Sequence, residues 1–265
     1  MTSLILVTGG TGTLGKLVVP RLREAGAKVR VLSRQAREAH GVDGDVEYVR
    51  GDLDTGAGIE AAVAGAEVIV HCAGAQKGDG DKTRALVQAA SRAGTPHLVN
   101  ISVVGADRVP QDSGLDRAMF GYFGSKLDAE QAVAGSGLPW TTLRATQFHE
   151  LWLTVARALA KLPVIPVATG TRFQPVDAGE VADRLVELAL ASPAELAPDI
   201  AGPRVYPMAD LVRTYLRAVG KRRPLLPVRL PGKAAAAVRA GANLGNERGG
   251  AHVTWEEFLA ARVGA

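Results

Sequence analysis

The chain has 265 residues, of which 47% are hydrophobic and 5% aromatic, and it carries a formal net charge of +4. This length predicts one large domain, or a domain with a small annex, whose core is mostly Ala, Val and Leu. There is no apolar run of about 18 residues, no basic leader with a cleavage site and no basic stripe, so we expect no membrane span, no signal peptide and no nucleic-acid partner.

The N-terminal residues contain the strongest motif. Leu4-Ile5-Leu6-Val7 is typical of a strand buried on both faces in a parallel sheet, and helical spacing starts at Leu17. In a phosphate cradle Gly9 allows the tight turn, Gly12 lets backbone approach a pyrophosphate, and Gly15 lets the helix pack closely. A turn without ligand is the alternative, whereas a P-loop is excluded because Leu17 stands where that motif needs a hydroxyl. The complete turn is Thr8-Gly9-Gly10-Thr11-Gly12-Thr13-Leu14-Gly15.

The second predicted strand, residues 28–32, closes a right-handed βαβ unit. Enzymes that use NAD usually have Asp or Glu at the end of this strand, where it binds the ribose 2′-hydroxyl. This chain has Ser33 and Arg34 there, with Arg37 one turn further on. Because arginine forms charge-assisted hydrogen bonds with a 2′-phosphate, the sequence favours NADP(H) over NAD(H); a solvated surface arginine is the alternative for Arg34.

A third predicted strand covers residues 46–50 and is followed by Gly51, Asp52 and Leu53. Asp52 stands at the carboxyl end of this strand, where its carboxylate could hold an adenine amino group. The alternative is an aspartate that only stabilises a turn.

The fourth predicted strand, residues 67–72, ends in Ala73-Gly74-Ala75, whose small side chains let a dinucleotide lie close to the backbone. We expect His71 and Cys72 to be core residues and expect no metal site, since no second Cys or His lies at ligand spacing. Cys72 is the only cysteine, which excludes internal disulfides and is typical of a reducing cytoplasm.

Candidate catalytic residues follow the fifth predicted strand, residues 97–101. Ser102 lies just beyond that strand, and a helix from Phe120 through Ala134 contains Tyr122 and Lys126, which share one face. An ammonium near a phenol stabilises the phenolate and lowers its pKa, so we expect Tyr122 to be a usable proton donor or acceptor near neutral pH. Because the carboxyl ends of parallel strands open onto one crevice, Ser102 could hold a substrate carbonyl oxygen beside Tyr122. Taken alone, Tyr-x-x-x-Lys also occurs by chance on many helices.

Strands and helices alternate up to a sixth strand over residues 138–144, which predicts a doubly wound parallel α/β sheet. We expect residues 1–147 to form a dinucleotide-binding domain and residues 148–265 to form a small α+β portion that supplies the other wall of a substrate cleft. That portion is predicted to contain short strands over 163–167, 172–176 and 224–230, and helices over 148–162, 179–191, 207–219, 234–240 and 255–263.

Taken together, these motifs resemble the short-chain dehydrogenase/reductase superfamily, in particular its extended and atypical, NmrA-like NAD(P)-binding branch. The resemblance implies a Rossmann fold in which Ser102, Tyr122 and Lys126 form the catalytic set and Lys126 also contacts the nicotinamide ribose. It further implies that Thr146, Gln147 and Phe148 lie by the nicotinamide. The matching segments are Thr8-Gly9-x-x-Gly12-x-x-Gly15, Gly51-Asp52-Leu53, Ala73-Gly74, Ser102, Tyr122-x-x-x-Lys126, Leu143–Phe148 and Pro175-Val176-Asp177.

The expected activity is the cytoplasmic, NADPH-dependent reduction of a carbonyl, or an activated C=C or C=N bond, of a small apolar molecule, with Tyr122 as proton donor. Two alternatives stay open. One is a non-catalytic NADP(H) sensor that binds a protein partner; the other is a sugar-nucleotide epimerase or dehydratase, against which Arg34 speaks but which Arg204 and Arg213 leave open. The substrate, the direction and stereochemistry of the reaction and the oligomeric state do not follow from the sequence, although homodimers are common for such folds.

Overall fold

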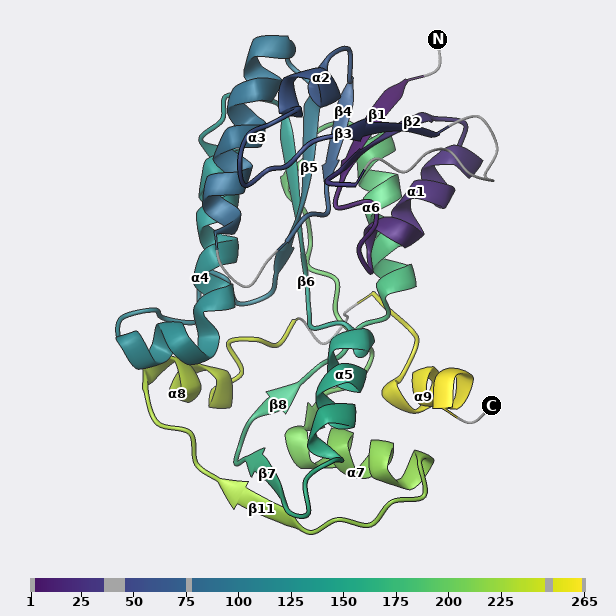
Figure 1. Ribbon diagram of the computed structural model, residues 1–265. Helices are drawn as coiled ribbons and strands as arrows, with labels where there is room; N and C mark the ends of the chain where they lie inside the picture. Colours follow the sequence, from purple (N-terminus) through teal and green to yellow (C-terminus); the bar gives the residue numbers. More distant parts are fainter. Residues whose placement is uncertain (1–2, 36–45, 75–77, 246–249, 264–265) are drawn as a thin grey trace. The chain divides into compact units, whose positions relative to one another are not determined.

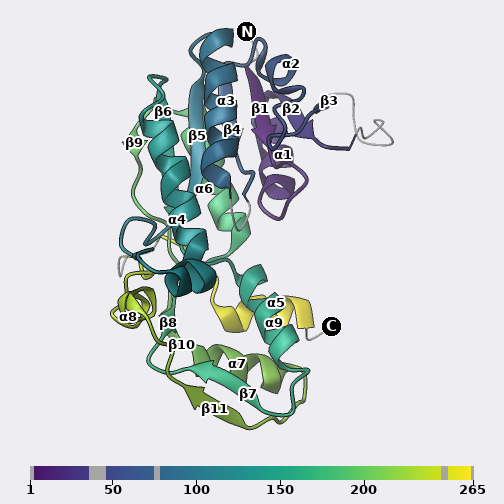
Figure 2. The same ribbon diagram turned by 60° about the vertical axis from the view of Figure 1, so that its left-hand side comes forward.

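The computed structural model describes residues 3–35, 46–74, 78–245 and 250–263, and the chain divides into two compact units (Figures 1 and 2). The first unit comprises Met1–Ser102, Ser125–Leu143 and Val181–Pro198, and the second comprises Val103–Gly124, Arg144–Glu180 and Asp199–Ala265. Each unit is therefore assembled from segments that are far apart in the sequence. The predicted boundary after residue 147 falls inside one segment of the second unit, and a substrate-binding role for the C-terminal portion stays a prediction.

A parallel sheet organises the first unit, and over the described residues it has seven strands in the order β3-β2-β1-β4-β5-β6-β9. The strand order reverses between β1 and β4, and doubly wound folds bind ligands outside the carboxyl ends of the strands at such a point. The doubly wound sheet predicted from the sequence is confirmed. Its strands are β1 (Leu4–Thr8), β2 (Lys28–Ser33), β3 (Val46–Arg50), β4 (Val68–His71), β5 (His97–Val103), β6 (Trp140–Ala145) and β9 (Glu195–Leu196).

Helices cover both faces of this sheet (Figure 1). On one face lie α1 (Gly15–Glu24) and α6 (Ala178–Leu190), which are joined by an ion pair between Arg21 and Asp183 at 2.5 Å. On the other lie α2 (Ile59–Val63), α3 (Asp79–Ala93) and the C-terminal half of α4 (Gly114–Ala134) (Figure 2). The core between the sheet and this second layer of helices is aliphatic, with Leu6, Ile69, Leu86, Leu98 and Val133 among its members.

Helix α4 begins earlier than the sequence predicts. We expect a loop up to Phe120, because the preceding segment is rich in Asp, Gly and Pro, but the helix starts at Gly114. Ser113 Oγ accepts the backbone N–H of Asp116 at 3.0 Å, a local contact that starts the first turn. The dihedral angles at Phe120 (φ −131°, ψ 15°) are not helical, so a kink separates the unpredicted turns from the predicted helix.

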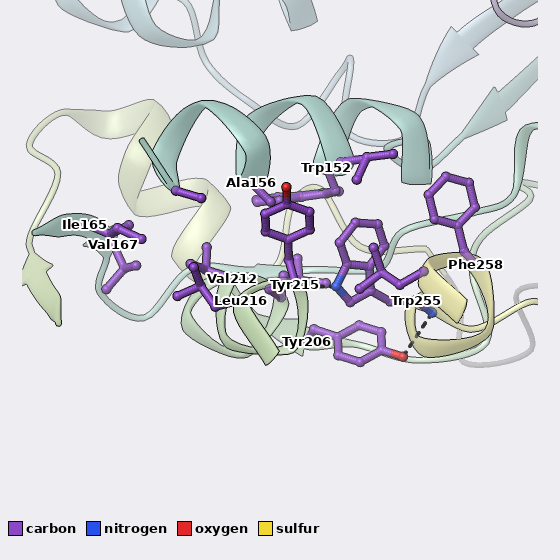
Figure 3. Packing of buried hydrophobic residues seen from close by; sticks show 14 residues of the cluster. Trp152, Ala156, Ile165, Val167, Tyr206, Val212, Tyr215, Leu216, Trp255 and Phe258 are labelled. Atoms are coloured by element: carbon purple, nitrogen blue, oxygen red, sulfur yellow. Dashed lines mark hydrogen bonds between the residues drawn. The ribbon is translucent and has the colours of Figure 1, made fainter. Parts of the chain in front are cut away.

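An aromatic cluster holds the second unit together (Figure 3). Trp255 is fully buried; its indole N–H donates to Leu211 O at 3.1 Å, and its backbone N–H donates to the Tyr206 hydroxyl oxygen at 3.4 Å. Trp152 packs edge-on against Phe173 with 4.4 Å between ring centroids. These rings bury large apolar areas, which a unit made of short elements needs for its stability.

The elements around that cluster pair in two small sheets: β10 with β8 antiparallel, and β11 with β7 parallel. The predicted helices and the predicted strand near residue 225 are confirmed, whereas the two-residue strands β9 and β10 were not foreseen. No helix in the described ranges has both the length and the apolar character needed to cross a membrane. The elements are α5 (His149–Leu159), β7 (Ile165–Ala168), β8 (Arg172–Phe173), β10 (Tyr206–Pro207), α7 (Met208–Ala218), β11 (Leu225–Val228), α8 (Lys233–Arg239) and α9 (Trp255–Val263).

Candidate functional site

The glycine-rich turn between β1 and α1 packs directly against the end of β4. Gly9 has a φ of +68°, and a Cβ built on it would lie 2.6 Å from the backbone N of Ala73. A Cβ on Gly15 would lie 2.2 Å from Gly9 O. The N–H of Gly12 donates to Gly9 O at 2.9 Å, which closes the turn. Backbone segments therefore touch at points where any side chain would intrude.

The N-terminus of α1 is open to an anion. Leu14 is its N-cap residue, no side chain in the described ranges caps it, and its first turn contains no acidic residue. Gly12 and Thr13, which precede the helix, are exposed. The first backbone N–H groups of a helix and its dipole attract negative charge, so this end fits the diphosphate of a dinucleotide.

A buried polar network lies beneath the turn. The fully buried Thr8 hydroxyl is 2.6 Å from His71 Nδ1, and His71 Nε2 is 3.2 Å from Thr83 Oγ1. Because the Thr83 hydroxyl donates to Asp79 O at 2.7 Å, it accepts from Nε2–H, and Nδ1 accepts from Thr8. Burial, helped by the charge of Lys126, lowers the pKa of His71 to about 3, so this ring stays neutral.

Cys72, the next residue in the chain, is equally unsuited to acid–base work at neutral pH. Burial raises the pKa of its thiol to about 12, with Lys126 opposing the shift. No cluster of three or more His, Cys, Asp or Glu side chains in the described ranges could hold a metal ion.

The strand ends at β2 and β3 form the predicted nucleotide side of the site. Ser33 Oγ accepts the N–H of Gln35 at 3.3 Å, and Arg34 between them is exposed. Asp52 Oδ1 accepts the N–H of Asp54 at 2.9 Å, the contact expected of an aspartate that stabilises a turn. The adenine role of Asp52 with Gly51 and Leu53 stays a prediction. Arg37 and Ala75, which the sequence placed in this site, lie outside the described residues.

Lys126 is the best-defined member of the predicted catalytic set. It is 4% exposed, its Nζ lies 3.1 Å from Asp79 Oδ2, and it donates to Ile101 O at 3.4 Å. The predicted cofactor residue Gly74 packs on the same pair, since a Cβ there would lie 3.0 Å from Nζ. The ammonium therefore donates to the residue that precedes Ser102, near the carboxyl end of β5.

Ser102 itself is 4% exposed, and its Oγ has no hydrogen-bond partner among the described residues. An unsatisfied buried hydroxyl costs about 1–3 kcal/mol, so such groups commonly mark a place where a ligand completes the hydrogen bond. Ser102 and Lys126 both belong to the first unit, and their catalytic roles stay a prediction.

Asp79 was missed by sequence reasoning. The spacing of apolar residues predicts an amphipathic helix over Asp81–Ala93, whereas α3 begins at Asp79. Its backbone N–H donates to Ser125 Oγ at 3.0 Å, and its side chain is 2% exposed. The only local signal is an acidic residue in a first helical turn, which usually indicates a cap. Nothing near it in the sequence indicates a pair with Lys126.

The remaining predicted residues belong to the second unit. Tyr122 lies one turn before Lys126 in α4, is 40% exposed and stands edge-on to Phe123 at 6.3 Å between centroids. Its placement opposite Ser102 stays a prediction.

The three predicted residues that follow β6 differ in their hydrogen bonding. Thr146 Oγ1 accepts the N–H of Gly202 at 3.4 Å and so is engaged within its own unit. Both polar side-chain atoms of Gln147 are buried without a partner in the described ranges, and Phe148 forms a backbone bridge with Val176. Gln147 therefore resembles Ser102 in having hydrogen-bonding capacity that the folded chain does not use.

Comparison with known proteins agrees with a nucleotide site. A family model described as NAD(P)H-binding matches residues 9–189. An NAD(P)H azoreductase from Xenophilus azovorans is 28% identical over 223 residues, which cover 82% of this chain and 74% of that enzyme. A (4-alkanoyl-5-oxo-2,5-dihydrofuran-3-yl)methyl phosphate reductase from Streptomyces griseus is 29% identical over 167 residues, which cover 63% of this chain and 56% of that reductase. The match thus spans little more than half the length of the second relative.

Solved structures share the fold. An Escherichia coli NADPH-dependent quinone oxidoreductase complexed with NADPH superposes with a TM-score of 0.79 at 19% identity, covering 97% of this chain and 99% of that one. A Citrobacter sp. triphenylmethane reductase complexed with NADP(H) gives 0.74 at 19% identity over the same shares. The matched residues include the glycines of the turn, helix α1 and strands β2 to β6 of the parallel sheet, and the chain belongs to this NAD(P)H-binding family of Rossmann-like α/β proteins.

Proposed function

We propose that the chain is an NADPH-dependent oxidoreductase of the short-chain dehydrogenase/reductase type, which reduces a carbonyl, or an activated C=C or C=N bond, of a small apolar molecule. The observation that carries the proposal is that the buried Lys126 ammonium donates to Ile101 O, immediately before Ser102, whose buried hydroxyl has no hydrogen-bond partner among the described residues. The azoreductase and the (4-alkanoyl-5-oxo-2,5-dihydrofuran-3-yl)methyl phosphate reductase among the relatives support reduction as the reaction class.

Bound NADPH would supply the hydride, which adds to the substrate carbon. The backbone of the glycine-rich turn and the N-terminus of α1 bind the diphosphate. Ser102 donates its hydroxyl hydrogen to the substrate oxygen, and Tyr122 transfers a proton to that oxygen as negative charge develops on it. Lys126 contributes a fixed positive charge that stabilises both the developing oxyanion and the tyrosine phenolate.

Asp79 has a positioning role in this scheme. A lysine side chain is flexible and strongly hydrated, and burying it without a counter-charge is costly. The Asp79 carboxylate and the Ile101 carbonyl fix Nζ from two directions, so the ammonium is already in place before the substrate arrives.

Oxidation of NADPH, followed by its absorbance in the presence of quinones, azo dyes and aldehydes, tests the proposal. We expect turnover of at least one class, and a loss of about 100-fold or more in kcat for Tyr122→Phe and a smaller loss for Ser102→Ala. Tyr215→Phe is the matched control, because Tyr215 lies in the aromatic cluster and has no role in the proposal. Unchanged turnover in Tyr122→Phe would rule out the assigned proton donor.

Two other outcomes point to the alternatives. Tight NADP(H) binding without turnover of any substrate, together with a protein recovered in a stable complex, indicates a sensor. NAD that remains bound through purification indicates an epimerase or dehydratase.

A further inference from the structure

The carboxyl ends of β2 and β3 place a second arginine beside the residues predicted to select NADP. Ser33 is in register with Arg50, the last pair of these two parallel strands. The N–H of Gly51 donates to Ser33 O at 2.9 Å, which fixes the backbone on either side of this pair. Arg50 therefore stands one strand away from Ser33 and Arg34, at the same level of the sheet.

The side chains of Ser33 and Arg50 project from the face of the sheet that carries the glycine-rich turn. A Cβ on Gly10 would lie 2.8 Å from Val31 Cγ1, so the side chain of Val31 faces the turn. Side chains alternate along a strand, and in-register neighbours share a face, so Ser33 and Arg50 lie on the same face as Val31.

On the opposite face of the same two strands, an arginine has a structural role. Arg30 is in register with Glu47, forms an ion pair with it at 2.8 Å, and also donates to Ala62 O and Ala64 O. Arg30 thus ties β2 to β3 and to the end of α2. Its charge is already compensated.

Arg34 and Arg50 have no such compensation. Both are exposed, and neither forms an ion pair with a carboxylate of the described residues. Of the two acids that follow β3, Asp54 pairs with Lys82 at 3.0 Å, and Asp52 Oδ1 accepts the N–H of Asp54. Two uncompensated guanidinium groups at one strand end create a positive potential that suits a dianionic group.

We propose that Arg50 is a second cofactor-selecting residue, which binds the 2′-phosphate of NADP(H) together with Arg34. This inference rests on the proposed function, in which the cofactor is NADPH. It adds a residue from the neighbouring strand to the single arginine that the sequence motif indicates, and it makes selectivity a shared property of β2 and β3.

Titration of the variants Arg50→Gln, Arg34→Gln and Arg50→Gln/Arg34→Gln with NADPH and with NADH tests the inference, using quenching of intrinsic fluorescence. The Arg50→Gln change should weaken NADPH binding by about tenfold and leave the dissociation constant for NADH within about twofold. Arg92→Gln is the matched control, because Arg92 is an exposed arginine of the same unit that pairs with Glu60 on the outer side of α2 and α3. Competition by 2′,5′-ADP against 5′-ADP should show the same selectivity without the nicotinamide.

Four results would overturn the inference. If Arg50→Gln leaves the NADPH dissociation constant unchanged, Arg50 does not contact the phosphate. If the variant weakens NADPH and NADH equally, Arg50 contacts a part that both cofactors share, such as the adenine ring. If the unmodified protein binds NADH as tightly as NADPH, there is no selectivity to explain, although the proposed reductase activity survives; if it binds neither, the proposed function fails as well.

Discussion

The two units of the chain use different means to hold themselves together. All five phenylalanines, two of the three tryptophans and three of the four tyrosines lie in the second unit. The core over the β-sheet of the first unit contains Leu, Ile, Val and Ala, with Trp140 at its edge. The glycine-rich turn and the buried ion pair of Lys126 with Asp79 lie near the strand ends of this unit, where the predicted site lies.

This difference teaches where each unit can tolerate change. A regular sheet between helices repeats the same spacing, so aliphatic side chains fill it and leave the strand ends free for polar groups. Short helices and two-residue strands have no such repeat, and large rings are needed to fill irregular gaps between them. The first unit should therefore be sensitive at its polar strand ends, and the second at its rings.

The largest effect expected is that of Trp255→Ala in the second unit. The side chain is fully buried and its N–H donates to Leu211 O, so its removal should lower the free energy of unfolding by about 3–5 kcal/mol. Chemical denaturation measures this loss. Hydrogen exchange should speed up in α7 and α9 before it does in β1 and β4; the opposite order would contradict the comparison.

The counterpart in the first unit is Asp79→Asn, which leaves the Lys126 charge buried without its carboxylate. Breaking a buried pair in this way costs about 3 kcal/mol, and kcat should fall while the dissociation constant of NADPH changes little. The double variant Asp79→Asn/Lys126→Met should regain part of the stability but none of the activity. Asp79→Glu should restore some activity, and if it behaves like Asn the carboxylate does not position Lys126.

Much of the fold and some features of the candidate site could be predicted from the sequence. The strands, the glycine-rich turn and the helix that contains Lys126 follow from local sequence patterns, and the roles of Ser102 and Lys126 stay a prediction. Asp79 could not be foreseen, because its role depends on Ser125 and Lys126, which folding brings to it from a distant helix. The first turns of α4 were missed for the opposite reason: local composition resembles a loop, and the contact between Ser113 and Asp116 overrides it.

A smaller effect is expected from each pH unit of acidification. The pKa of His71 is about 3 in the folded chain against its ordinary 6.5, so below pH 6.5 the unfolded chain binds a proton that the folded chain does not. Stability due to neutral His71 is complete above pH 6.5 and is lost as the pH falls from 6.5 toward 3, by at most about 1.4 kcal/mol per pH unit. Burial also lowers the pKa of His149 in the second unit, and its contribution has the same sign.

Denaturation curves recorded across that pH range, for the unmodified chain and for His71→Gln, measure the effect. The variant should lose stability less steeply on acidification. Equal slopes would show that His71 does not resist protonation in the folded state, and a reduced slope in a His149→Gln variant alone would place the acid-sensitive group in the second unit.

The smallest effects are expected at exposed ion pairs, and here the two units should behave alike. Arg92 with Glu60 in the first unit and Arg213 with Asp210 in the second are each about half exposed or more. Arg92→Gln and Arg213→Gln should each change the free energy of unfolding by about 0.5 kcal/mol or less. A loss of several times that amount at either position would mean that surface charge, too, distinguishes the units.

The contact between Gly15 and Gly9 has a consequence for how this chain can vary. A Cβ at position 15 would lie 2.2 Å from Gly9 O, which already accepts the N–H of Gly12, whereas a Cβ built on Gly121 in α4 would have nothing within 4 Å. In a library of random codons selected for folded protein, position 15 should return glycine alone and position 121 a broad range of residues. Helix α1 can thus pack against the glycine-rich turn only because residue 15 has no Cβ.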